Sequence, residues 1–285
     1  MKYTNALNLP QAIVDAVKND DYDSGNSFLT ATQLNKPVQM VRLEKQYKDQ
    51  IVEDISDNIY ALMGKAIHYI LEKAESVMIV EKRLYASVMG KQISCQLDRL
   101  ALISENGGFT GKVQDYKFAS IWQYIYGVNR EYEEQLNIIA YILGRNEYKV
   151  SQLEIIMIFR DWQKSKAKYD KNYPQQQIAV IPVELWSAGK QEAFILNKIE
   201  KHESTDLFEC TQEERWNKGD KWAVMKKGNK KAKKLCMSRD DANEWIIDKV
   251  PDIDKTKYYI EHRPGENIRC ENYCSVKTWC PQYNK

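Results

Sequence analysis

The sequence has no long hydrophobic run. No stretch approaches the roughly 18–20 consecutive apolar residues that a membrane-spanning helix needs, so we expect no membrane partner. The first residues, MKYTNALNLPQAIV, also lack the apolar core and the small-residue cleavage site of a secretory signal. We therefore expect a cytoplasmic protein, in which cysteines bind metal or are buried rather than forming disulfides.

Glycine and proline are also scarce, with 12 and 7 among 285 residues, which excludes collagen-like and low-complexity chains. Hydrophobic residues make up 43% and charged residues 29%, and this balance argues against a largely disordered protein. The length predicts one or two domains with enough chain to bury a sizeable core.

Positive charge is concentrated in one stretch. Residues 218–234 contain eight lysines and one acid, a local charge of +7, whereas the whole chain carries +2 and the remainder therefore −5. Trp222–Lys226 and Lys231–Cys236 are expected to form a basic hairpin around Gly228-Asn229. Such a segment either attracts phosphates or is a solvated surface loop.

The expected elements indicate a mixed α/β sheet. After a polar, turn-rich segment at Gly25–Pro37, apolar residues at steps of three and four predict a helix from about Ser56 to Ser76. The following elements are then expected in chain order: strands Val77–Ala86, Lys91–Ser104 and Phe109–Phe118, helix Glu131–Leu143, and strands Leu153–Phe159 and Gln177–Leu185. Three hairpin-linked strands, a crossover helix and a returning strand form a mixed sheet. Later helices are expected to begin after Ser187 and Ser238.

Two carboxylates and a lysine stand out on the second and third of these strands. Side chains alternate along a strand, so Asp115 and Lys117 share a face from which Tyr116 points away. An antiparallel neighbour could bring Asp98 close to Asp115. Two adjacent carboxylates repel each other unless a cation lies between them, and a hard divalent ion such as Mg²⁺ or Mn²⁺ suits oxygen ligands. With a lysine to orient water, this combination can hydrolyse phosphodiesters.

Less specific interpretations remain open for these residues. Asp115 and Lys117 could be solvated or paired with each other without any catalytic role. His68 lies among charged residues of the predicted helix, where a lone histidine is usually a surface residue. Gly64 shares its helix face, and the missing side chain at Gly64 could let His68 approach the sheet.

Taken in order, these residues resemble a known family. Gly64 with His68, then Asp98, then Asp115-x-Lys117 and finally Gln135 are similar to the motif set of the RecB-type branch of the PD-(D/E)XK nucleases. The resemblance implies a restriction-endonuclease-like core with the element order helix, three strands, helix, strand. On this view the chain divides into an N-terminal helical segment (1–52), the nuclease core (53–186) and a C-terminal extension with the basic hairpin and the cysteine cluster (187–285).

The resemblance also implies roles for individual residues. The expected metal ligands are His68, Asp98, Asp115 and the Tyr116 carbonyl. Lys117 would position the nucleophilic water, which makes Asp98, Asp115 and Lys117 the catalytic set, and Gln135 would contact DNA near the cut. The branch usually has a tyrosine four residues after the glutamine, and this sequence has Ile139 there. Tyr132 shares the helix face with Gln135 and is expected to substitute.

Further stretches resemble phage-encoded members of this branch. They are Phe159–Trp162, Glu213–Trp216, Trp222–Lys226 and the tail from Arg269 to Pro281. The resemblance implies a protein of the host cytoplasm that prepares DNA ends for phage recombination or replication, beside a single-strand annealing protein.

The cysteines of the tail form a cluster, Cys270-x3-Cys274-x5-Cys280. Thiolates at this spacing suit Zn²⁺ or an iron–sulfur cluster, including the 4Fe–4S type, and either needs a fourth ligand in its usual form. Cys210 is the first candidate and Cys236 the second, whereas Cys95 on a predicted strand is expected to be buried. Three unliganded thiols are the alternative. A bound group would hold the tail to the rest of the chain.

The leading hypothesis is a divalent-metal-dependent deoxyribonuclease, an exonuclease acting on linear duplex ends. The hairpin lysines expected to hold the DNA backbone are Lys226, Lys227, Lys230 and Lys231. Three tryptophans could stack on an unwound base, with the alternative that each is a core residue or a sheet-edge contact: Trp122, Trp162 and Trp186. A non-catalytic nucleic-acid-binding module with a structural four-cysteine metal site is the alternative, and a nuclease for RNA or single strands is a third hypothesis.

Overall fold

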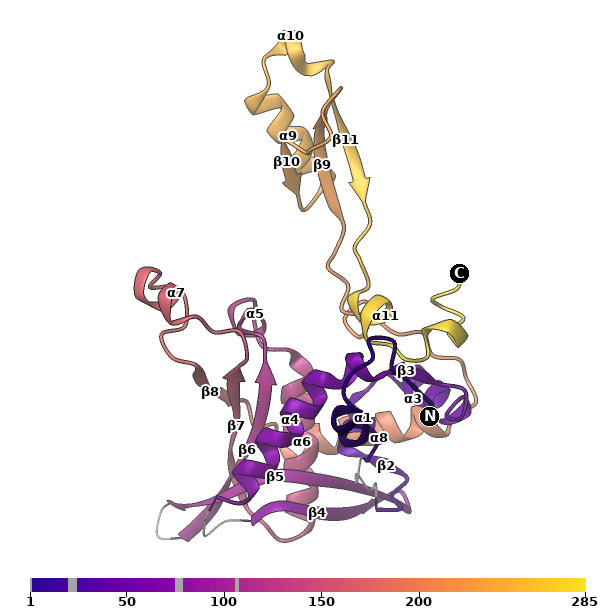
Figure 1. The fold of residues 1–285 in the computed structure, drawn as a ribbon, viewed down its shortest axis with the longest axis vertical. Coiled ribbons are helices and arrows are strands. Elements are labelled where there is room, and N and C mark those ends of the chain that lie inside the picture. Colours follow the sequence, from indigo (N-terminus) through magenta and orange to yellow (C-terminus); the bar gives the residue numbers. More distant parts are fainter. Residues whose placement is uncertain (1, 20–24, 75–78, 106–107) are drawn as a thin grey trace. The chain divides into compact units, whose positions relative to one another are not determined.

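The computed structural model describes residues 2–19, 25–74, 79–105 and 108–285. The chain forms two compact units, Met1–Leu207 and Phe208–Lys285 (Figure 1). The three-part division expected from the sequence remains a prediction. Helix α8 (Ala188–Glu203), which that division assigned to the C-terminal extension, belongs to the first unit.

The first unit is built around a six-stranded sheet, which is mixed, as expected. Its main strand order is β2 (Leu29–Thr30), β5 (Lys91–Glu105), β6 (Gly108–Ala119), β7 (Val150–Phe159) and β8 (Ile178–Val183), and β4 (Ile79–Val88) also pairs with β5. The β4–β5, β5–β6 and β7–β8 pairs are antiparallel, whereas β6 and β7 are parallel. A parallel pair needs a crossover, and helix α6 (Arg130–Arg145) supplies it. The mixed α/β class is therefore confirmed.

Helix α6 is the centre of the hydrophobic core. Every residue from Leu136 to Leu143 is buried, which is possible because α6 packs against the sheet and also against α8 and α2 (Ala31–Asn35). Ile139 is 2% exposed and belongs to this core. The buried Asn137 side chain donates to the carbonyl oxygens of Glu133 and Glu184 and accepts from Trp186 N–H and the Gln191 amide. A buried amide that is fully hydrogen-bonded avoids the cost of desolvation.

Helix α4 (Ile59–Glu72) carries His68 and contacts β6, and none of its residues is fully buried. It corresponds to the helix expected from Ser56 to Ser76. A 3₁₀ turn occupies Ile55–Asn58, and residues 75 and 76 lie outside the described residues. The segment Gly25–Pro37, expected to be turn-rich, instead contains β2 and α2. Thr30 and Gln33 form a reciprocal capping box at the start of α2.

The remaining helices of the first unit are α1 (Gln11–Lys18), α3 (Val38–Gln46), α5 (Ile121–Ile125) and α7 (Lys164–Tyr169). Strands β1 (Lys2–Thr4) and β3 (Val52–Asp54) pair in parallel, so the first 52 residues contain strands as well as helices. The expected cap of α8 is confirmed, because Ser187 accepts a hydrogen bond from Lys190 N–H. No helix among the described residues is long and apolar enough to cross a membrane.

The second unit contains a three-stranded antiparallel sheet in the order β10 (Lys234–Cys236), β9 (Lys221–Lys226) and β11 (Tyr258–Arg263). The β9–β10 pair is the basic hairpin expected from the sequence. Helix α9 (Arg239–Lys249), capped by Ser238 as expected, packs its buried Ala242 on the sheet against Val224 and Cys236. The chain ends with α10 (Asp252–Lys255), α11 (Ile268–Asn272) and a 3₁₀ turn at Lys277–Trp279.

Candidate functional site

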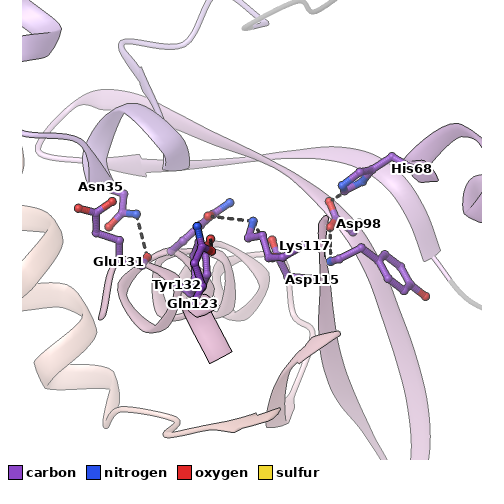
Figure 2. Close-up of polar contacts among 10 residues, drawn as sticks. Asn35, His68, Asp98, Asp115, Lys117, Gln123, Glu131 and Tyr132 are labelled. Atoms are coloured by element: carbon purple, nitrogen blue, oxygen red, sulfur yellow. Dashed lines mark hydrogen bonds and ion pairs between the residues drawn. The ribbon is translucent and has the colours of Figure 1, made fainter. Parts of the chain in front are cut away.

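Strands β5 and β6 bring two carboxylates and a lysine together (Figure 2). The ladder between these strands ends with Arg99 opposite Gln114, so Asp98 and Asp115 are the next residue on each strand. The Lys117 ammonium lies 2.6 Å from the Asp115 carboxylate, which confirms that both side chains share one face of β6. Asp115 is only 4% exposed, so this ion pair differs from a solvated surface pair.

His68 reaches the same place from α4. Its Nδ1 lies 3.5 Å from Oδ1 of Asp98, and its ring meets the edge of the Tyr116 ring with centroids 6.2 Å apart. The other Asp98 oxygen accepts a 2.8 Å hydrogen bond from Tyr116 N–H. The expected role of Gly64 is wrong, because a Cβ added there would meet nothing within 4 Å. His68 therefore approaches the sheet through the placement of α4 as a whole.

The electrostatics of the site disfavour negative charge. Burial raises the pKa of Asp98 to about 7, and the neighbouring charge of Asp115 adds to this effect. The charges of His68 and Lys117 and the Tyr116 N–H act in the opposite direction but do not cancel it. Burial acts to lower the pKa of Lys117, yet the Asp115 carboxylate outweighs it and the pKa is raised. The lysine is therefore a cation at neutral pH.

Two residues of α6 complete the surroundings of Lys117. Its Nζ donates to Oε1 of Gln135 at 3.4 Å and lies 5.2 Å from the centroid of the Tyr132 ring. Burial raises the pKa of Tyr132, so the phenol stays neutral. The structure thus brings Gln135 and Tyr132 to the same lysine, whereas Ile139 lies in the core.

Sequence reasoning did not identify Gln123. This residue lies on α5, directly after β6, and its Oε1 accepts a 3.1 Å hydrogen bond from the Tyr132 hydroxyl. The available signal is positional, because loops that follow the carboxyl ends of parallel strands commonly carry functional groups. No residue-type pattern singled it out.

The fit of the site to a divalent cation rests on its donor chemistry. In the part of the chain that the structure describes, no group of three or more His, Cys, Asp or Glu side chains has the geometry of a metal site. However, two close carboxylates, one of them with its pKa raised to about 7, form a place where added positive charge is favourable. Their oxygens match the preference of Mg²⁺ and Mn²⁺. A metal role for the Tyr116 carbonyl stays a prediction.

The expected phosphate-binding lysines belong to the second unit and differ in availability. Lys227, Lys230 and Lys231 are exposed in the hairpin connection. Lys226 is half-buried, with its Nζ 5.5 Å from the centroid of the Tyr258 ring. The first three are therefore more accessible to a polyanion than Lys226.

Four thiols of the second unit influence one another. The pKa of Cys210 is raised to about 12, first by burial and then by the neighbouring groups Glu214, Cys280, Cys270 and Cys274. Cys236 instead lies in the small core beneath α9. The Gln282 side chain holds the Cys210 backbone with two hydrogen bonds, of 2.8 and 2.9 Å. Cys210 thus lies within electrostatic range of the tail triplet, but in the described residues no group of three or more of these side chains has the geometry of a metal site, so its role as fourth ligand stays a prediction. Cys95 is buried, as expected.

We expect Cys274→Ser to remove most of the iron or zinc that the purified protein carries. A bound cation stabilises thiolates that otherwise repel one another, and a four-ligand site loses a ligand in this variant. Elemental analysis of anaerobically purified protein measures the loss, and the visible spectrum distinguishes iron–sulfur from zinc. The control is Cys236→Ala, which should keep the metal. Equal metal content in the wild type and Cys274→Ser would show that the tail thiols are not ligands.

No protein-family model matches the sequence, and no curated protein matches it. Among solved structures, one titled "Crystal structure of SSO0001" is similar with a TM-score of 0.44 and 16% sequence identity. The alignment covers 67% of this chain and 82% of that chain. The functional conclusion therefore rests on the site itself.

Proposed function

We propose that this protein is a divalent-metal-dependent DNA exonuclease with a restriction-endonuclease-like core. One observation carries the proposal: a protonated lysine, the buried Asp115 and the partly buried Asp98 meet where the pairing of β5 with β6 ends, next to a crossover helix. Burying this many charges is costly for a purely structural site, whereas a phosphoryl-transfer site needs both a cation-binding group and a positioned donor.

Each residue of the site has a distinct role in this proposal. Asp98, Asp115 and His68 would hold the cation, with the Tyr116 carbonyl as a further ligand. When bound, the ion polarises the scissile phosphate and makes the attacking water more acidic. Lys117 donates hydrogen bonds that orient this water toward phosphorus. Gln135 fixes the Lys117 ammonium and presents its amide N–H groups to a neighbouring phosphate.

The proposed substrate is linear DNA, digested from duplex ends in the cytoplasm. The resemblance of the chain to phage-encoded nucleases supports a role in recombination or replication, with a single-strand annealing protein as partner. The exposed lysines of the β9–β10 hairpin suit contacts to the phosphate backbone, which carry no sequence information.

The test is hydrolysis of an end-labelled linear duplex by the purified full chain, with Mg²⁺ and with EDTA. We expect progressive shortening with Mg²⁺, none with EDTA, and no nicking of a closed circular duplex. Lys117→Met should lower the rate by about a hundredfold or more, the usual scale for a positioned proton-transfer group. Labels at the 5′ and the 3′ end reveal the direction of digestion.

The matched control is Lys112→Met. Lys112 lies on the same strand and is also paired with a carboxylate, Glu154, at 2.9 Å, but it alternates onto the other face of β6. The Lys112→Met variant should cleave DNA at the wild-type rate. DNA retained on a gel without any Mg²⁺-dependent cleavage would instead favour the non-catalytic binding module.

A further inference from the structure

The segments that follow β6 and β7 form an exposed surface beside the site. Helices α5 and α7 lie beyond the carboxyl ends of these strands (Figure 1). We use the term α5–α7 surface for the side chains of Trp122, Tyr126, Lys164, Lys166 and Lys168. All five are exposed, and none belongs to the hydrophobic core.

Two aromatic rings form the apolar part of this surface. Trp122 and Tyr126 stack with centroids 5.6 Å apart and planes 20° apart, yet they remain 45% and 81% exposed. Helix α5 packs on the rest of the unit through its opposite side, where Ile121 is buried and Tyr124 contacts the ring of Phe159. Stabilising the fold therefore does not require an exposed tryptophan here.

Helix α5 is held firmly at its start. Asp161, just after β7, accepts hydrogen bonds from Ser120 Oγ at 2.6 Å and from Ile121 N–H at 2.7 Å. Ser120 caps the helix through Trp122 N–H. The aromatic pair is thus presented on a fixed element, which lowers the entropy lost when a ligand binds.

The charge around the pair is positive. Lys166 Nζ lies 5.8 Å from the centroids of both the Trp122 and Tyr173 rings, and it links α7 to α5. Lys164 and Lys168 lie on the same short helix. Nearby, the Arg160 guanidinium lies 3.9 Å from the centroid of the Tyr60 ring. The acid beside α5, Asp161, is already engaged by Ser120 and Ile121.

This surface connects directly to the candidate catalytic lysine. Gln123, next to Trp122, accepts from the Tyr132 hydroxyl, and the Tyr132 ring lies under Lys117. A nucleotide stacked on Trp122 would therefore lie next to the residues that contact Lys117, the lysine proposed to act in phosphodiester hydrolysis. Aromatic rings interleaved with cations are the usual platform for unpaired nucleotides, since every base has a π-face.

We propose that the α5–α7 surface binds an unpaired DNA strand, with bases stacked on Trp122 and Tyr126 and phosphates held by the α7 lysines. The proposal rests on the proposed nuclease function and adds to it the form in which the strand enters the site. The other two tryptophan candidates do not fit. Trp186 is 5% exposed, and Trp162 is partly buried and donates its indole N–H to the Pro174 carbonyl.

Binding is measured with the full chain in EDTA, by anisotropy of a labelled oligothymidylate and of a duplex of equal length. Trp122→Ala should weaken binding of the single strand by about fivefold or more, the lower end of the effect of one lost stacking contact. Duplex affinity should change by less than about twofold, because duplex bases stay paired. Tyr126→Ala should show the same pattern, and its high exposure makes misfolding no concern.

Two controls accompany these variants. Trp122→Phe keeps a stacking ring and should retain most of the affinity. Phe109→Ala removes another exposed aromatic ring, at the opposite end of β6, and should bind like the wild type. Unchanged single-strand affinity in folded Trp122→Ala and Tyr126→Ala would overturn the proposal, and so would an equal loss for the duplex. Because EDTA prevents metal-dependent cleavage, these outcomes are independent of whether the chain hydrolyses DNA.

Discussion

Replacing Asp115 with asparagine should abolish hydrolysis of linear DNA, lowering its rate by at least about a thousandfold. Asparagine keeps the shape of the side chain but removes the charge that pairs with Lys117 at 2.6 Å and that, in the proposed site, binds the cation. The change therefore removes transition-state stabilisation from two groups at once. Single-turnover cleavage of an end-labelled duplex at saturating Mg²⁺ measures the rate, and anisotropy in EDTA checks that DNA binding persists.

Glu154→Gln is the matched control for this substitution. Glu154 is a partly buried carboxylate on the neighbouring strand β7, bonded to Lys112 and Gln114 of β6, and it has no place in the proposed site. Its loss should leave the cleavage rate within about threefold of the wild type. Full activity of Asp115→Asn would refute the proposed metal site, and unfolding of Asp115→Asn alone would show that Asp115 is structural.

Asp98→Asn should stabilise the metal-free protein at pH 8 while inactivating it. The Asp98 pKa is raised to about 7, above the ordinary aspartate value of about 3.9, so the folded state binds this proton more tightly than the unfolded chain. Stability of the wild type therefore falls as pH rises from about 4 to about 7, and above that range the buried charge imposes its full cost. Asparagine has no charge to bury and can still accept the Tyr116 N–H. The expected gain is on the order of a few kcal/mol at pH 8.

Thermal or urea unfolding in EDTA at pH 4 and pH 8 measures this difference. The gain in the free energy of unfolding of Asp98→Asn over the wild type should be present at pH 8 and absent at pH 4. Added Mg²⁺ should reduce this gain at pH 8, because the ion stabilises only the wild type. Asp54→Asn provides a control of opposite sign. A hydrogen bond from Ala6 N–H, with others from Ser56 and Thr4, lowers the Asp54 pKa, so its loss should destabilise the protein at pH 8. A less stable Asp98→Asn at pH 8 would contradict the expectation.

Local patterns predicted much of the fold. Alternation and turn residues placed β4, β5 and β6, and side-chain hydroxyls at Ser187 and Ser238 marked two helix starts, because these signals depend on neighbouring residues only. The register of an antiparallel hairpin follows from its turn, so Asp98 beside Asp115 was also predictable.

Other features depend on contacts that no local pattern encodes. Strand β2 has two residues and forms only because β5 accepts them in parallel. The approach of His68 depends on how α4 lies on the sheet, and the hydrogen bond between Gln123 and Tyr132 joins two separate elements. The exposure of Trp122, in contrast to the burial of Trp186, is likewise a result of tertiary packing.

The hydrogen-bonded Asn137 amide fixes the rotation of α6 about its own axis, and with it the direction in which Gln135 points. Successive residues of an α-helix are rotated by about 100°, so a small turn of α6 about its axis would carry Gln135 away from Lys117. Apolar packing alone resists such rotation weakly, because one aliphatic side chain can replace another on the buried side. Asn137 has directional bonds to Glu184, Trp186 and Gln191, and these bonds set the angular position of the helix. An uncharged residue in the core thus determines where the polar groups of α6 point.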